Sequence, residues 1–370
     1  MDNVVDRTPF YKRLCFNLSS IAILVFVLHV GKEILIPFFL AILLATLLLP
    51  INNFLERKRL PRIIAILLSL LFSLIIIAGI VYFMVNQIAN FFDDMPAIHA
   101  RVDTMSDAIQ KWVRETFDVT IRKQDQLVIE LKRNTSGVGI LGATFVTATH
   151  AISYFVLLPI YAFLVLYYRD LIKKFLVASF NDGKEEEVRN ILQESQAISQ
   201  SYIAGLLIEM TIVFALNAIG FWILGIKYAL FLAIVSAVLN LIPYIGMLTA
   251  NILCMLITLI SSEVMRVSDI IWVGVILLVV QFFDNNFLMP LVVGSKVRIN
   301  ALVTLVGVLV GGALCGIPGM FLSIPGLAVL KVIFDRVDGL RPYGVLLGDF
   351  NPAADPKKWR VKNLLTPHLR

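Results

Sequence analysis

The sequence predicts an all-α integral membrane protein with about six full spans and two re-entrant helical hairpins, the hairpins being part of an inverted repeat. Hydrophobic residues make up 59% of the 370 residues and charged residues only 16%, and the mean hydropathy is +0.86. A soluble domain usually carries about a quarter charged residues. Apolar runs of the roughly 20 residues that cross a bilayer as a helix recur along the whole chain. The bilayer is therefore the expected solvent for most of this protein.

The charged and metal-binding residue types argue against several functional classes. The formal charge of +6 comes from short Lys and Arg clusters beside apolar runs, so it indicates membrane topology and no nucleic-acid partner. The three Cys and four His lack ligand spacing, which predicts no metal site. No P-loop, nucleophile elbow or HExxH motif occurs in the sequence. We therefore expect no enzyme activity, no catalytic residues and no cofactor.

The N-terminal region, residues 1–85, is expected to hold three spans at about 15–30, 34–51 and 63–85. The loop at 56–62 has the sequence ERKRLPR, with four basic residues and one acidic residue. Loops rich in Lys and Arg stay in the cytoplasm. This rule predicts a cytoplasmic loop, a cytoplasmic N-terminus and an external segment after the third span.

The external segment, residues 86–149, carries apolar residues at helical spacing and is expected to form an amphipathic helical region. Two interpretations stay open for it: a lid or assembly surface, or a solvated hairpin packed on the spans. Residues 150–200 are expected to hold a fourth span at about 151–168 and a polar cytoplasmic helix. Arg169, Lys173 and Lys174 follow that span directly and support its inward direction.

Residues 201–335 contain two further spans, at about 202–226 and 270–288, and two long interrupted apolar stretches. The stretches, residues 228–260 and 301–334, are each too short for two full spans with a loop and too long for one. NLIPYIG interrupts the first at 240–246, and GGALCGIPG interrupts the second at 311–319. Residues 336–370 are expected to form a basic cytoplasmic tail.

Proline and glycine at these interruptions predict a break in each helix. Backbone groups freed by such a break cannot face lipid, so they must line protein or a polar cavity. The residues expected to form the two breaks are Pro243, Tyr244, Gly246, Gly316, Pro318 and Gly319.

The two interrupted stretches also follow spans of opposite direction, which makes span plus hairpin an inverted repeat. Paired interruptions in two halves of a membrane protein point to the binding site of a secondary transporter. Two ordinary helix pairs with tight turns would leave the topology unchanged, so that interpretation stays open. Residues 201–335 are accordingly the predicted transport core.

Polar residues within the spans lie in this same core. Gln281, Asp284 and Asn285 follow the i, i+3, i+4 spacing of one helix face. A carboxylate at membrane depth is costly and should face a cavity or a partner. Glu209 lies about 10 Å from the inner end of its span and Asp284 about 9 Å from the inner end of an antiparallel one, so they are expected at similar depth. Asn240, beside the first break, could contact substrate or satisfy freed backbone.

Three motifs together resemble the AI-2E transporter family: NLIPYIG at 240–246, DNNFLMPLVVG at 284–294 and GGALCGIPGMFLSIPGLAVLKVIFD at 311–335. The resemblance covers about residues 195–348. Asp284, Asn285 and Pro290 occupy the family's D-N…P positions, and Pro243, Tyr244 and Gly246 its I-P-Y-x-G positions. Met247 stands where many members carry Pro, which affects the expected shape of that turn.

The resemblance implies a multi-pass protein of the bacterial cytoplasmic (inner) membrane with about eight membrane segments, counting hairpin arms, that assembles into a homo-oligomer. The basic clusters predict that both termini are inside, and the apolar spans predict contact with membrane lipid. Family members are linked to export of the quorum-sensing signal autoinducer-2 or to exchange of sodium or other monovalent cations for protons. The leading hypothesis is export of a small polar solute, the second is cation/proton antiport, and the third is a membrane scaffold or sensor. The predicted substrate or ion pathway comprises Asp284, Asn285, Gln281, Asn240 and Glu209.

Overall fold

The computed structural model describes residues 9–93, 137–180, 183–242, 245–261, 267–292 and 299–348. These residues form helices and short connections, with no strand among them and one isolated bridge between Ile299 and Gly348. The predicted all-α class is confirmed for this part of the chain. Most of the external segment at 86–149, the break residues Pro243 and Tyr244, and the tail from residue 349 lie outside the described residues.

The helices follow the predicted order of apolar segments. In chain order they are α1 (Phe10–Val30), α2 (Lys32–Arg57), α3 (Arg62–Asp93), α6 (Gly137–Ala178), α7 (Glu185–Ile223), α8 (Ala229–Asn240), α9 (Ile245–Ser261), α10 (Val267–Phe283), the π-helical turn η1 (Asp284–Leu288), α11 (Met289–Val292), α12 (Ala301–Arg336), the 3₁₀ turn η2 (Asp338–Leu340) and α13 (Arg341–Leu347).

Five of the described helices are long and apolar enough to cross a membrane: α2, α3, α7, α12 and the run from Ser268 to Leu291. Shorter apolar helices occur at Leu14–Val30, Ala229–Asn240 and Gly246–Ser261. Large apolar side chains on these helices are widely exposed, such as Ile75 at 63% and Trp222 at 78%. A soluble monomer rarely exposes so much contiguous apolar surface. The chain is thus a multi-pass membrane protein, while six full spans and a re-entrant course for the hairpins stay predictions.

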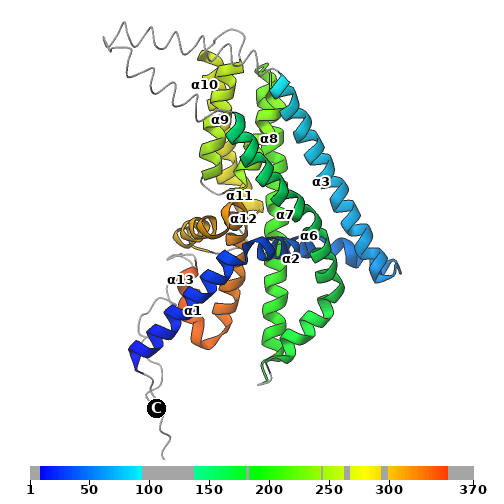
Figure 1. Ribbon diagram of the computed structural model, residues 1–370, viewed down its shortest axis with the longest axis vertical. Coiled ribbons are helices and arrows are strands. Elements are labelled where there is room, and N and C mark those ends of the chain that lie inside the picture. Colours follow the sequence, from blue (N-terminus) through cyan, green and yellow to red (C-terminus); the bar gives the residue numbers. More distant parts are fainter. Residues whose placement is uncertain are drawn as a thin grey trace, which may run out of the picture.

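The central element is α7, a continuous helix of 39 residues that joins the predicted polar helix to the fifth span. It begins with Glu185, Glu186 and Glu187, whose charges suit the positive end of the helix dipole. Figure 1 shows α7 along the long axis of the molecule, with α8, α9 and α10 toward one end and α12, α13 and α1 toward the other. Helix α7 packs on α8, α10, α12, α2 and α6. It therefore connects the end of the molecule with α8, α9 and α10 to the end with α12, α13 and α1.

Small apolar cores hold these helices together. One core joins α7 to α8, α9 and α10 around Phe221, Leu232 and Val273. A second joins α2, α3 and α6 around Ile66 and Leu166. Between helices that are already in lipid, close van der Waals packing stabilises association more than burial from water does.

Both predicted interruptions coincide with changes of chain direction. Helices α8 and α9 are separate arms that pack on each other, and the Cys254 thiol lies 3.6 Å from the Leu232 carbonyl oxygen of the facing arm. Gly246 lies against the Leu239 carbonyl, where a Cβ atom would clash with backbone. The lack of a side chain at Gly246 therefore permits the close approach of the two arms.

Helix α12 folds back on itself at Gly316, whose φ of 65° and ψ of −151° are accessible essentially to glycine alone. Beyond this turn the arms pack closely, and a Cβ added at Gly311 would come within 2.5 Å of the Gly319 carbonyl oxygen. The Ser323 hydroxyl donates across the hairpin to the Gly307 carbonyl at 2.9 Å. Pro318 lies just after the turn, at the start of the second arm.

Candidate functional site

The buried polar centre of the molecule is formed where α7, α8 and η1 meet. Glu209 comes from the middle of α7, Asn240 from the last residue of α8 and Asp284 from the first residue of η1. The Asn240 amide nitrogen donates to Asp284 Oδ2 at 3.1 Å and lies 3.4 Å from Glu209 Oε1. Glu209 is 6% exposed and Asp284 3% exposed. One amide thus bridges two buried carboxyl groups that come from different helices.

The two carboxyl groups are incompletely satisfied. The Asn240 amide lies within hydrogen-bonding distance of both, but two ionised carboxylates cannot hydrogen-bond to each other because they only accept. One buried oxygen of each, Oε2 of Glu209 and Oδ1 of Asp284, has no donor among the described residues. A buried acceptor without a donor is costly. A proton on one carboxyl group or a small cation bound at the pair would lower this cost.

The polar stripe predicted for the sixth span is present next to this pair. Gln281 donates from its amide to Asp284 Oδ2 at 3.4 Å and to Asn285 Oδ1 at 3.2 Å. Asn285 itself is exposed, whereas Gln281 is partly buried. Gln281 therefore connects the buried carboxyl pair to the helix surface at Asn285.

The chain around Asp284 is a π-helical turn, which the sequence did not predict. The Met289 N–H donates to the Asp284 carbonyl oxygen, a bond of the wider i to i+5 type. Single π-helical turns within α-helices are frequent at functional sites. Because the turn starts at Asp284, it changes the helix register at the carboxyl group itself.

Apolar side chains surround the carboxyl pair. Val213, Ala237 and Val280 form a small core from α7, α8 and α10, with Met210 and Leu288 packed against it. Such surroundings lower the local dielectric and strengthen every electrostatic interaction at the site. The charge state of the pair is therefore expected to respond strongly to any proton or cation that enters.

A second buried polar pair lies further along α7, and our sequence reasoning missed it. The Asn217 amide donates to Ser236 Oγ of α8 at 3.1 Å, and Asn217 Oδ1 has no donor among the described residues. Asn217 is about 12 Å beyond Glu209 along the helix. Ser236 precedes Asn240 by four residues, so these two residues share one face of α8. That spacing was the available sequence signal.

The two predicted hairpin breaks differ in their relation to the site. Gly246 lies against the carbonyl group of Leu239, the residue before Asn240, and so belongs to the same region. Within the described ranges, by contrast, no hydrogen bond or ion pair links Gly316, Pro318 or Gly319 to the carboxyl pair. Those ranges also contain no group of three His, Cys, Asp or Glu residues that could hold a metal ion.

Comparison with known proteins gives one consistent result. The sequence model described as AI-2E family transporter matches residues 18–339. A candidate transport protein of Mycobacterium tuberculosis is 28% identical over 96% of this chain and 93% of its own length. YrrI of Bacillus subtilis, also named as a candidate transport protein, is 27% identical over 82% and 86%. The AI-2 transport protein TqsA of Escherichia coli is 23% identical over 92% and 96%.

Proposed function

Because this chain belongs to the AI-2E transporter family, we propose that it is a secondary transporter that exports a small polar solute through the region around Glu209, Asn240 and Asp284. The observation that carries this proposal is the buried carboxyl pair with one unpartnered oxygen on each side chain. Ionisable residues within membrane spans usually mark pathways for substrates, ions or protons.

The proposed solute is autoinducer-2 or a molecule of similar size and polarity. The name of the relative TqsA, AI-2 transport protein, supports this choice. The polar groups around the carboxyl pair supply both acceptors, from Glu209 and Asp284, and donors, from Asn240 and Gln281. A small molecule rich in hydroxyl groups requires such a mixture.

Exchange of sodium or another monovalent cation for protons is the second candidate function. In this reaction Glu209 and Asp284 alternate between a bound proton and a bound cation. The two unpartnered oxygens favour it, since a bound proton or cation would supply a partner that these oxygens lack. The same pair would serve as the coupling site of a solute exporter, so the two functions differ in what else is carried.

A membrane scaffold or sensor is the weakest of the three candidates. A scaffold gains nothing from a costly buried carboxyl pair. For the arrangement in the cell we propose the cytoplasmic membrane of a bacterium, both termini inside and a homo-oligomer. Four basic residues at the junction of α2 and α3 support this orientation: Arg57, Lys58, Arg59 and Arg62.

The experiment uses purified protein in liposomes with an imposed pH gradient. Autoinducer-2 flux and sodium-dependent proton movement are measured for wild type, Asp284→Asn and Glu209→Gln. Matched controls are Asp269→Asn at the start of α10 and Glu186→Gln at the start of α7, which change acids on the same two helices away from the pair.

We expect both pair variants to lose coupled transport and both controls to retain it. Solute flux without cation exchange supports the exporter, and sodium-coupled proton movement supports the antiporter. Full coupled transport in Asp284→Asn would refute a role for the pair. The absence of both activities in the wild-type protein would favour the scaffold.

A further inference from the structure

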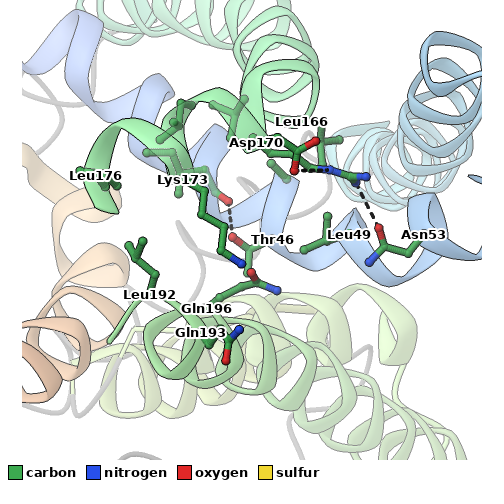
Figure 2. Close-up of a pocket in the computed structure, with 15 residues that line it drawn as sticks. Thr46, Leu49, Asn53, Leu166, Asp170, Lys173, Leu176, Leu192, Gln193 and Gln196 are labelled. Carbon is green, nitrogen blue, oxygen red and sulfur yellow. Dashed lines mark hydrogen bonds and ion pairs between the residues drawn. The ribbon is translucent and has the colours of Figure 1, made fainter. Parts of the chain in front are cut away.

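A cavity of about 590 Å³ lies between α2, α6 and α7, apart from the carboxyl pair. Gln193 and Gln196 line it from α7, and Gln196 precedes Glu209 by 13 residues, or about 20 Å along the helix. Figure 2 shows Lys173 extending from α6 toward Gln196, with Thr46 and Asn53 on the α2 side. Asp170, which lines the cavity, contacts Arg62 at the start of α3, so the cavity lies beside the basic loop that joins α2 to α3.

The charged groups at this cavity leave one cation without a partner. Arg169 donates to Glu56 at 2.6 Å and to Asn53 Oδ1 at 3.1 Å. Asp170 accepts from Arg62 at 2.7 Å. Lys173 forms no ion pair or hydrogen bond with any residue that the structure describes. Since the other charges are paired, the cavity presents one net positive charge.

The lining carries most of its polar groups further along each of two helices, although the change is not complete. On α2, Ile42, Ala45 and Leu49 precede Asn53, with Thr46 among them. On α6, Val165 and Leu166 precede Arg169 and Lys173, and Ile172 and Leu176 also line the cavity. From Ile42 to Asn53 the rise is about 16 Å, and from Val165 to Lys173 about 12 Å. An occupant that matches this gradient has an apolar chain at one end and an anionic head at the other.

We propose that this cavity binds an anionic glycerophospholipid, with its phosphate at Lys173 and the amides of Gln193 and Gln196, and an acyl chain along Ile42, Ala45 and Leu49. Basic pockets between membrane helices bind phosphate headgroups in this way. Lysine is a suitable partner because its ammonium carries three donors on a flexible stem. The site is independent of the transported solute.

The test measures lipid binding by the full-length protein after it has been stripped of lipid in detergent. Phosphatidylglycerol is titrated and bound copies are counted by native mass spectrometry. Phosphatidylcholine with the same acyl chains tests the charge requirement, and inorganic phosphate tests whether the head alone suffices. The variants are Lys173→Gln, Gln196→Trp, which fills the cavity from an exposed position, and Lys174→Gln as the matched control.

We expect Lys173→Gln to weaken phosphatidylglycerol binding about fivefold, which corresponds to one basic residue at a lipid surface. Gln196→Trp should abolish the tightest binding event, and Lys174→Gln should leave it unchanged because Lys174 does not line the cavity. Equal binding by wild type and Lys173→Gln, or equal binding of phosphatidylcholine, overturns the proposal. Displacement of the lipid by inorganic phosphate would assign the cavity to a soluble phosphate anion and overturn the lipid.

Discussion

Three glycines of α12 allow the hairpin turn to be tested against internal controls. Gly316 has a backbone conformation that residues with a Cβ adopt only with strain, yet a Cβ there would contact nothing within 4 Å. Gly316→Ala therefore introduces backbone strain without a clash, at a cost of about 1–3 kcal/mol. Gly326 also has open space but lies in ordinary helix, so Gly326→Ala should stabilise by about 0.5–1 kcal/mol.

The third glycine, Gly311, tests the effect of a steric clash, which differs from the backbone strain tested at Gly316. At Gly311 a new Cβ would collide with Ser323 Oγ and the Gly319 carbonyl, so the two arms must move apart. Gly311→Ala should therefore destabilise the protein more than Gly316→Ala does. The three substitutions add the same methyl group, and only its surroundings differ.

Thermal unfolding of the purified protein in detergent, followed by tryptophan fluorescence, measures the series. With about 2 °C per kcal/mol for a chain of this size, the Tm of Gly316→Ala should lie about 3 °C or more below that of Gly326→Ala. Equal Tm values for these two variants would refute the left-handed turn at Gly316, and with it the hairpin form of α12.

Three further predictions follow from named contacts. Asn240→Leu removes the amide shared by Glu209 and Asp284, so it should lower the free energy of unfolding by about 2–3 kcal/mol. It should also impair coupled transport. Unfolding and flux assays that both match wild type would contradict the bridging role of Asn240. Gly246→Ala should reduce the yield of folded protein on size exclusion because its Cβ would clash with the Leu239 carbonyl. The control Gly274→Ala should not reduce the yield, because its Cβ would meet only Met255 at 3.5 Å. Equal yields would argue against close packing of α8 on α9. A double-mutant cycle with Glu56→Gln and Arg169→Gln should give a coupling free energy of about 1 kcal/mol, because solvent reaches both side chains, each about a quarter exposed, and weakens the ion pair. Additive Tm shifts would show that the ion pair contributes nothing to stability.

Much of the fold follows from hydropathy and from Pro and Gly placement. Apolar runs predicted the helices, and the interruption at 311–319 contains the turn at Gly316. Helix ends were harder to predict, because α7 joins a polar segment and an apolar segment with no break. Hydropathy marks where a helix enters lipid, whereas hydrogen bonding decides where the helix itself ends.

The candidate site was predicted in part. The spacing of Gln281, Asp284 and Asn285 predicted one polar stripe. The distances of Glu209 and Asp284 from their span ends predicted a similar depth, but not the Asn240 amide that bridges them. The π-helical turn was not predicted, because hydropathy and residue spacing follow the α-helical repeat and give no signal for a change to i+5 hydrogen bonds. The ion pair between Arg62 and Asp170 was missed for a related reason, since it joins residues 108 positions apart.

The length of α7 has a mechanical consequence. Its 39 residues extend about 58 Å, nearly twice the hydrocarbon thickness of a bilayer. The same helix carries Gln196 at the cavity between α2, α6 and α7 and Glu209 at the carboxyl pair, about 20 Å apart. A tilt of about 5° about its cavity end would move Glu209 by about 1.7 Å, enough to break or restore its contact with Asn240. A small rotation of α7 at its cavity end is therefore sufficient to rearrange the hydrogen bonds of Glu209.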